Sequence, residues 1–336
     1  MSKPVSQEKF VPSEISFGGG ALSGFYDSFE FSDIVDAFTE ALDSGINSFD
    51  TSPYYGNSEI LMGDAFKQIR EKYPRENYYI ATKMGRYGKT VHEMDYSAKK
   101  TYESVAESLK RLHTDYLDVV YAHDVEFVKF EEVVGKGQAL EALFDLKAQG
   151  KIKYVGCSAY PLEVLLKVAE HQFAKGQPLD IILSYAHYTL QNTSLADYAP
   201  KFRAAGVKYI MSASPLCMAL LRDEATPDWH PAHSGIREAA DKAVSVTSKN
   251  NLSMANMANR FSFQGKDTFG LDSTVLGLAR KSEVQDAVRT LKDVKERENS
   301  ELENKVFEEI HKIFEPVKNF SWQSPTEVEL ALPKTL

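Results

Sequence analysis

The sequence has few cysteines, no long apolar run and no excess of positive charge. Its two cysteines, Cys157 and Cys217, are too few for a disulfide framework and are typical of a reducing compartment. The first ten residues lack the apolar segment of a secretory leader, and no later stretch is apolar over the length of a membrane span. We therefore expect a cytoplasmic protein that does not enter the membrane.

Charge and composition narrow the partners further. A net charge of −9 disfavours sequence-independent binding to nucleic acid or to an anionic membrane surface. Hydrophobic residues make up 43% of the chain and charged residues 26%, which is enough for a large core without global disorder. A chain of 336 residues could hold two domains, but α/β barrels commonly reach this length as one.

Short apolar runs alternate with stretches of helical periodicity along most of the chain. Eight runs are predicted to be strands: 15–17, 46–49, 78–82, 116–121, 153–157, 181–183, 209–211 and 274–276. Residues with apolar side chains at helical spacing lie between successive strands, as in the segment 31–43. Each such crossover returns the chain to start the next strand in the same direction, which requires a parallel sheet.

Eight units of this kind predict a (β/α)8 barrel of the TIM type, formed as a single domain with a core at about 15–294. The alternative is an open doubly wound sheet, but no Gly-x-Gly-x-x-Gly follows the first strand to support it. Two connections are longer than the others: residues 126–138 after the fourth strand and 216–234 after the seventh. Long loops on this face usually determine specificity. Residues 298–336 are predicted to form a helix that packs on the barrel, followed by a loose tail.

Four chemically active side chains fall at or near neighbouring strand ends. Asp50, Lys83 and His123 end the second, third and fourth strands, and Tyr55 lies in the loop after the second. Singly, each has an ordinary explanation as a helix cap, a core aromatic, a surface lysine or a loop histidine. In a barrel, however, all these strand ends open on one face, so the four converge.

The four residue types complement one another. A phenol has a pKa near ~10, and a neighbouring ammonium lowers it while a carboxylate holds the ammonium in place. An imidazole can orient a substrate oxygen. The set is therefore suited to proton exchange with a carbonyl or hydroxyl, and the accompanying hydride requires a nicotinamide.

The stretches 49–56, 81–83 and 116–123 resemble the aldo-keto reductase superfamily. The resemblance implies a nicotinamide-dependent barrel enzyme with Asp50, Tyr55, Lys83 and His123 as its catalytic tetrad. The stretches 123–130 and 183–185 are similar to sugar dehydrogenases of that family, which oxidise the anomeric carbon of an aldose to an aldonolactone on routes to ascorbate-type acids.

The resemblance also implies the ligand contacts. Contacts to the cofactor are expected from Gly19, Gly20, Ser158, Ser184, Ser214, Leu216, Gly277 and Arg280. Contacts to the substrate are expected from Tyr54, Asp124 and Trp229, the last as a pocket wall or as loop packing. No metal is expected, because the motif formed by Asp228, His230 and His233 lies in a proline-rich loop where such spacing is usually incidental.

Some positions depart from the family pattern. Ala159 stands where the family often has asparagine, Ser184 where it has glutamine, and Ala213 where it has an aromatic that stacks on the nicotinamide. Members that use NADP place a basic residue at or near Gly277, where it pairs with the 2′-phosphate. Its absence here favours NAD as the cofactor, unless Arg280 reaches back to that place.

Three functions remain open. The first is an NAD-dependent aldose 1-dehydrogenase acting on D-arabinose or the related L-galactose and L-fucose. The second is an NADPH-dependent general aldehyde or carbonyl reductase, and the third is a non-catalytic regulatory subunit that retains the barrel. The Gly277 region and the stretch 123–130 favour the first. Oligomeric state is not evident from the sequence, and we expect a monomer or a small homo-oligomer.

Overall fold

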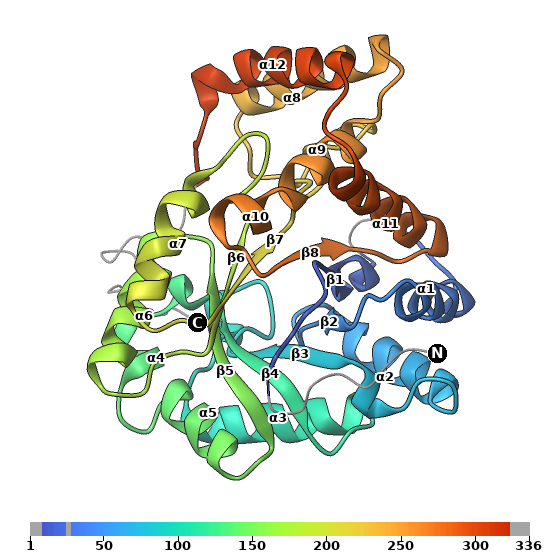
Figure 1. Ribbon diagram of the computed structural model, residues 1–336. Coiled ribbons are helices and arrows are strands. Elements are labelled where there is room, and N and C mark those ends of the chain that lie inside the picture. The colour runs from blue at the N-terminus through green and yellow to red at the C-terminus, as the bar shows by residue number, and fades with distance from the viewer. Residues whose placement is uncertain (1–8, 25–27, 323–336) are drawn as a thin grey trace.

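The computed structural model describes residues 9–24 and 28–322, and within them eight parallel strands close into a barrel in sequence order (Figure 1). The strands are β1 (Ile15–Gly18), β2 (Ser48–Asp50), β3 (Tyr79–Met84), β4 (Leu117–His123), β5 (Ile152–Ala159), β6 (Ile181–Tyr185), β7 (Tyr209–Ala213) and β8 (Ser273–Gly277). The predicted barrel is thus confirmed. Asp50 and His123 are the last residues of β2 and β4, and Ser158 is the second-last residue of β5.

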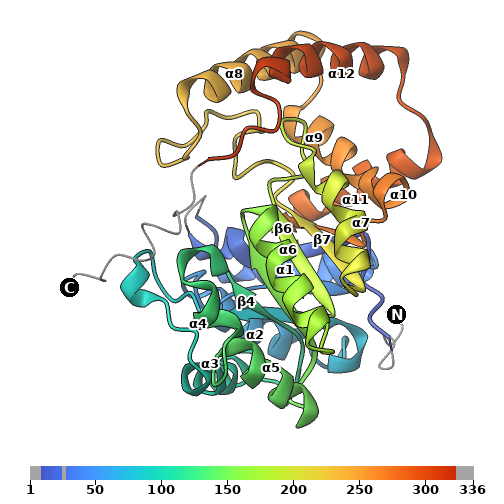
Figure 2. The same ribbon diagram turned by 90° about the vertical axis from the view of Figure 1, so that its left-hand side faces the viewer.

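Helices connect successive strands around the outside of the barrel (Figures 1 and 2). The α-helices are α1 (Phe31–Asp43), α2 (Ser58–Ile69), α3 (Ala98–Arg111), α4 (Phe130–Val134), α5 (Ala139–Ala148), α6 (Leu162–Ala174), α7 (Ser194–Ala204), α8 (Ser234–Lys249), α9 (Met254–Phe263), α10 (Gly265–Phe269), α11 (Lys281–Glu296) and α12 (Glu301–Phe314). The 3₁₀ helices are η1 (Gly19–Ser23), η2 (Arg75–Asn77), η3 (Val91–Glu93), η4 (Val125–Phe127) and η5 (Glu315–Val317). None of the described helices is long and apolar enough to cross a membrane.

The connection after β4 is more regular than the sequence indicated. Residues 126–138 contain the end of η4 and the short helix α4, where an extended loop was predicted. Two glycines, Gly135 and Gly137, suggested a loop, but Gly135 only ends α4 as its C-cap. The segment 214–233 after β7 does lack regular helix or strand, as predicted.

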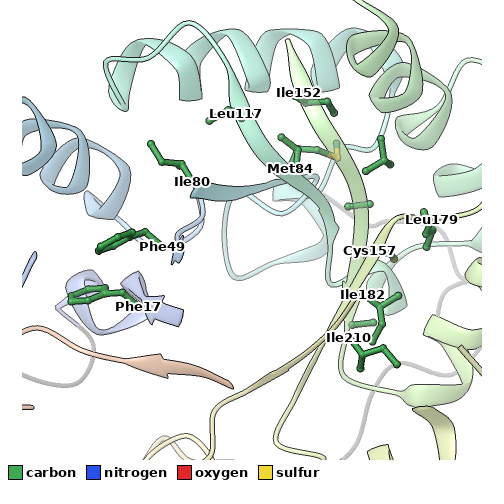
Figure 3. Close-up of a cluster of buried hydrophobic side chains, with 14 of the residues drawn as sticks. Phe17, Phe49, Ile80, Met84, Leu117, Ile152, Cys157, Leu179, Ile182 and Ile210 are labelled. Atoms are coloured by element: carbon green, nitrogen blue, oxygen red, sulfur yellow. The ribbon is translucent and has the colours of Figure 1, made fainter. Parts of the chain in front are cut away.

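The strands bury both of their faces. On β4, Val119 and Tyr121 point into the barrel, while Val120 and Ala122 point outward to the helices. The outer layer is the larger core, and it includes Phe17, Phe49, Ile80 and Met84 among many others (Figure 3). Because both faces are buried, the strand sequences are continuous apolar runs and do not alternate between apolar and polar residues.

An aromatic cluster closes the end of the barrel where the strands begin. Phe10, which precedes β1, inserts among Tyr79, Tyr154 and Tyr209, with ring centroids 4.7, 5.5 and 5.1 Å away. Edge-on and tilted contacts at these distances are favourable. Because this end is filled, a small molecule can approach the interior only from the opposite face, where the strands end.

The helix predicted in the C-terminal segment is present as α12, but it lies along α8 rather than on the strands (Figures 1 and 2). Val306, Phe307, Ile310 and Phe314 form its buried side. They join a second core with α8, α9 and the loop after β7, in which several alanines of α8 allow close approach. Helical spacing predicted a buried side but could not identify its partner. Residues 323–336 of the predicted tail lie outside the described residues.

Helices α2 and α3 approach each other closely at Gly63. A Cβ added at Gly63 would lie 2.0 Å from the carbonyl oxygen of Arg111. Glu59, one turn earlier on α2, is buried and accepts hydrogen bonds from Ser108 Oγ (2.7 Å) and from Arg111 Nη1 (2.9 Å). Together they position the start of α2, which follows the loop that carries Tyr55.

We predict that Gly63→Ala destabilises the protein by about 1–3 kcal/mol, because the added methyl group overlaps the backbone of Arg111. Helix propensity alone predicts the opposite sign, a gain of about 1 kcal/mol. The measurement is the urea midpoint of unfolding, with Gln68→Ala on the exposed side of the same helix as control. A higher midpoint for Gly63→Ala would contradict the close packing of α2 on α3.

Candidate active site

A buried ion pair lies at the mouth of the barrel. Lys83 on β3 is 1% exposed, and its ammonium donates hydrogen bonds to Asp50 Oδ1 on β2 and to the carbonyl oxygen of Thr51, the latter at 2.8 Å. The two strands are neighbours in the sheet, with Asp50 paired to Ala81, two residues before Lys83 on β3. Burial raises the pKa of the Asp50 carboxyl, and the positive charge of Lys83 opposes that effect.

Tyr55 and His123 lie beside this pair. The ammonium nitrogen of Lys83 is 4.8 Å from the centroid of the Tyr55 ring, and the ring meets that of His123 edge-on at 5.9 Å. A side chain at Gly20 would lie 3.8 Å from Cε2 of Tyr55, so the backbone of η1 passes next to the phenol. The four residues of the predicted tetrad are therefore close together, although Asp50 and His123 are 73 positions apart in the sequence.

His123 is held as a neutral imidazole. Its pKa is lowered to about 3, mainly by burial; Asp124 opposes this shift, and the charges of Lys83 and Arg86 add to it. Its Nδ1 lies 3.2 Å from Ser52 Oγ, and its Nε2 lies 3.4 Å from Asp124 Oδ2. A carboxylate beside Nε2 favours the tautomer with the proton on that nitrogen, so Ser52 donates to Nδ1. The ring thus presents an N–H donor that adds no charge.

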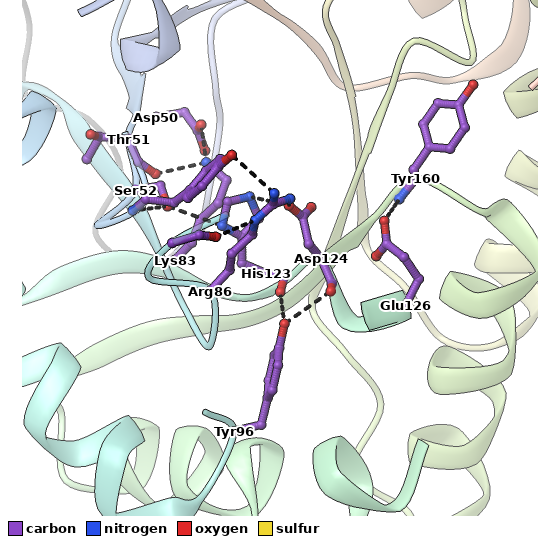
Figure 4. Close-up of polar contacts among 12 residues, drawn as sticks. Asp50, Thr51, Ser52, Lys83, Arg86, Tyr96, His123, Asp124, Glu126 and Tyr160 are labelled. Atoms are coloured by element: carbon purple, nitrogen blue, oxygen red, sulfur yellow. Dashed lines mark hydrogen bonds and ion pairs between the residues drawn. The ribbon is translucent and has the colours of Figure 1, made fainter. Parts of the chain in front are cut away.

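The sequence analysis missed two residues that shape this site. Arg86, in the loop after β3, donates to Asp124 Oδ2 at 2.6 Å and to the hydroxyl of Tyr54 at 3.1 Å (Figure 4). The hydroxyl of Tyr96 donates to the backbone carbonyls of His123 and Asp124. Asp124 itself has a left-handed backbone, with φ of 51°, which turns its carboxylate back toward His123. Neither Arg86 nor Tyr96 has a distinctive signal in the sequence, and their contacts with the segment 123–124 are evident only from the fold.

Glu126 is a third buried carboxyl near the mouth. Its Oε1 accepts a hydrogen bond from the backbone N–H of Tyr160 at 3.0 Å, and its Oε2 has no partner among the described residues. Its pKa is raised to about 8, mainly by burial and then by the charge of the nearby Asp124. Glu126 is therefore mostly protonated at neutral pH, and Figure 4 places it on the Tyr160 side of the site.

The residues predicted to contact the cofactor differ in their surroundings. Ser158, the second-last residue of β5, is paired with His123, and its hydroxyl is buried without a partner among the described residues. Ser184 Oγ is instead 3.4 Å from Nδ1 of His187. Gly19 packs tightly, because a Cβ there would be 2.7 Å from Ser58 Oγ.

The loop after β7 begins with a series of unusual backbone conformations. Ser214, Cys217, Met218 and Ala219 all have positive φ, and Ser214 Oγ accepts a hydrogen bond from the N–H of Met218 at 2.9 Å. Leu216, between them, packs on both outer cores. The contacts of Ser184, Ser214 and Leu216 with a cofactor remain predictions.

The Glu283 carboxylate of α11 lies at the connection that follows β8. Gly277 is exposed and paired with Gly18 of β1. Glu283, in the first turn of α11, accepts hydrogen bonds from the N–H groups of Ala279 (2.7 Å) and Arg280 (3.0 Å). The guanidinium of Arg280 donates to the carbonyl oxygen of Ser28 at 2.5 Å and lies 3.7 Å from Glu283. Arg280 is thus engaged with Ser28 and Glu283, and the Glu283 carboxylate caps the start of α11.

Trp229 lies in the loop after β7, 50% exposed and stacked on His230. Its contact with substrate remains a prediction. The neighbouring histidines are used structurally: His230 Nε2 donates to the carbonyl oxygen of Cys217, its Nδ1 accepts from Ala232 N–H, and His233 caps α8. The described residues contain no cluster of metal-ligating side chains.

Comparison with known proteins identifies the family. The chain matches the aldo/keto reductase family over residues 14–306. It is 34% identical to L-galactose dehydrogenase of Arabidopsis thaliana over 314 residues and 37% identical to D-arabinose 1-dehydrogenase of Saccharomyces cerevisiae over 320 residues. Each match covers 93% of both chains.

A solved structure described as an aldo-keto reductase of Pseudomonas aeruginosa has the same fold, with a TM-score of 0.60 and 21% identity over 88% of this chain and 95% of the other. The barrel, the matched length and the identity to two full-length relatives agree. The chain therefore belongs to the aldo/keto reductase family of oxidoreductases.

Proposed function

We propose that this chain is an NAD-dependent aldose 1-dehydrogenase, which oxidises D-arabinose or the related L-galactose and L-fucose at C1 to the aldonolactone. The observation that carries the proposal is the phenol of Tyr55 beside the buried pair of Lys83 and Asp50, with neutral His123 at its edge. Two relatives that match along 93% of their length are dehydrogenases of sugars, which supports an aldose as the substrate.

In this proposal Tyr55 is the general base. The Lys83 ammonium stabilises its phenolate, which takes the proton of the C1 hydroxyl. The N–H of His123 donates a hydrogen bond to the same oxygen and determines which face of C1 is presented. A nicotinamide, when bound, supplies the acceptor for the hydride that leaves C1. Loss of the proton and the hydride converts the C1 alcohol of the closed sugar ring into the carbonyl of the lactone.

The residues at the mouth fit a nicotinamide. The hydroxyl of Ser158 has no partner within residues 9–24 and 28–322 and lies one strand away from His123, so it can hydrogen-bond a carboxamide, a group that both donates and accepts. Gly20 lies next to the Tyr55 ring, since a Cβ there would be 3.8 Å from Cε2 of the ring. The buried hydroxyl supports the assignment of Ser158 to the cofactor, and the assignment of Gly20 rests on its position beside Tyr55.

NAD is proposed as the cofactor because of the charges after β8. The family's NADP-using members need a basic residue near Gly277, and this chain has glycine there. Glu283 holds the N–H groups at the start of α11, where an anionic phosphate would otherwise be favoured. A second negative charge at this position is unfavourable, so the 2′-phosphate of NADP is disfavoured.

The proposal predicts that D-arabinose or L-galactose is oxidised with NAD, at a kcat/KM at least ~10-fold higher than with NADP, because like charges penalise the phosphate. Steady-state formation of NADH and NADPH measures the ratio. Glu283→Gln should narrow it by relieving the repulsion, with Glu308→Gln on the exposed side of α12 as the control. Activity confined to NADPH and simple aldehydes would instead identify a general carbonyl reductase.

Replacing Tyr55 by phenylalanine should lower turnover of the sugar by about 10²–10⁴-fold, the usual contribution of a general base. Binding of NADH, followed by fluorescence titration, should change little because the ring remains. Tyr102→Phe is the matched control, since this tyrosine on α3 is exposed and bonded to Asp145. Undiminished turnover by Tyr55→Phe would exclude Tyr55 as the base.

A further inference from the structure

Arg86 is fixed in one orientation by contacts on several sides. Its Nη1 donates to Asp124 Oδ2 at 2.6 Å, its Nη2 to the Tyr54 hydroxyl at 3.1 Å and its Nε to the carbonyl oxygen of Gly88 at 3.2 Å. The guanidinium plane also lies over two rings, 4.0 Å from the centroid of Tyr54 and 4.9 Å from that of Phe127. A planar cation held by hydrogen bonds and stacking loses little further freedom when it binds a ligand.

This guanidinium is close to the reacting centre. Asp124 Oδ2, which accepts from Arg86, is also 3.4 Å from Nε2 of His123. A single carboxylate oxygen therefore separates Arg86 from the imidazole that orients the C1 oxygen in the proposed mechanism. Figure 4 shows Arg86, His123 and Asp124 directed toward one another, on the side of the mouth that also holds Lys83 and Asp50.

Arg86 has more N–H groups than it has acceptors among the described residues. Three of its five N–H groups bond within residues 9–24 and 28–322, which leaves one N–H on each of Nη1 and Nη2. Its side chain is 14% exposed, so part of it reaches the surface of the protein. An ion pair that only stabilises the fold does not need to lie beside the imidazole of His123. It also does not need two N–H groups that have no acceptor among the described residues.

We infer that Arg86 and Asp124 together bind the hydroxyl group on the carbon next to the reacting carbon, C2 of an aldose. The guanidinium donates a hydrogen bond to the oxygen of this hydroxyl, and the carboxylate accepts a hydrogen bond from its O–H. A sugar hydroxyl is both acceptor and donor, and a cation and an anion side by side satisfy both functions. The inference rests on the proposed function and names the part of the substrate that the site selects.

The inference explains how one barrel mouth distinguishes a sugar from a plain alcohol. A site built to hydrogen-bond a hydroxyl rejects an analogue that lacks it, because the buried polar groups are then left without a partner. Lysine in place of Arg86 would keep the charge, but it could not pair with Asp124, bond Tyr54 and donate to the ligand in the same geometry. If Arg86→Lys loses the preference for the C2 hydroxyl, the preference depends on the hydrogen bonds of the guanidinium and not on its positive charge alone.

The test compares kcat/KM for D-arabinose and for 2-deoxy-D-ribose, which is D-arabinose without its C2 hydroxyl. If L-galactose is the better substrate, L-galactose and its 2-deoxy form replace them. Wild type should prefer the sugar with the C2 hydroxyl by about 10–100-fold, the range of one or two charge-assisted hydrogen bonds. Arg86→Lys should lose most of this preference through a lower value for the intact sugar, with the deoxy sugar changed less than about threefold.

Controls separate local from general effects. Arg70→Lys removes an exposed guanidinium at the end of α2 and should keep the wild-type preference. NADH affinity and the melting temperature of Arg86→Lys should stay near those of wild type. Asp124→Asn keeps the side-chain shape, weakens the acceptor and should reduce the same preference, so the test stands even if Arg86→Lys folds poorly.

The possible failures are distinct. If wild type oxidises neither sugar, the proposed function is wrong and the inference falls with it. If wild type oxidises the sugar but both variants keep its preference, or lose activity equally on both sugars, the proposed function stands. In that case Arg86 and Asp124 only support the structure, and the inference is overturned.

Discussion

The site depends on the burial of one charge pair, Lys83 and Asp50. A lysine that is 1% exposed is tolerated only with a partner, because an isolated buried charge costs several kcal/mol. The partner is on the adjacent strand, and the carbonyl oxygen of Thr51 accepts a second hydrogen bond from the ammonium. The cation is thereby fixed 4.8 Å from the centre of the Tyr55 ring. Removing either charge would leave the other buried and uncompensated, so this pair couples stability to the chemistry.

The strands and the loops around this pair contribute different residues to the site. The ends of β2, β3 and β4 carry Asp50, Lys83 and His123, whose relative positions are set by the register of the sheet. The loops that follow β3 and β4 carry Arg86 and Asp124, which form an ion pair with each other. A rigid scaffold with variable loops allows ligand preference to change while the side chains at the strand ends stay in place.

The sequence was sufficient to predict the barrel and the proximity of Asp50, Tyr55, Lys83 and His123, whose catalytic roles stay predictions. Alternating strand and helix periodicity fixes the order of elements, and a parallel barrel then brings all strand ends to one face. Arg86 was not found because nothing near it in the sequence is periodic or distinctive. Its importance comes from Asp124, which lies 38 positions away, and from stacking on Tyr54.

Burial and tertiary partners account for the other differences. Glu126 lies in a stretch that was noted for its resemblance, but only the fold shows that its carboxyl is buried with one oxygen unpaired. The spacing of Phe307 and Ile310 predicted a buried side of α12, yet the partner proved to be α8. A hydrophobic pattern indicates that a surface is covered, and only packing indicates by what.

The central claim is that the hydride leaves C1 of an aldose while Tyr55 takes the hydroxyl proton. The most direct measurement uses D-arabinose or L-galactose carrying deuterium at C1, with the reduced nicotinamide and the sugar product analysed by mass spectrometry. The account predicts that the label appears in the reduced nicotinamide, that the product is the unlabelled lactone, and that turnover slows with a primary isotope effect. Label retained in the sugar product, with no deuterium in the nicotinamide, would contradict it.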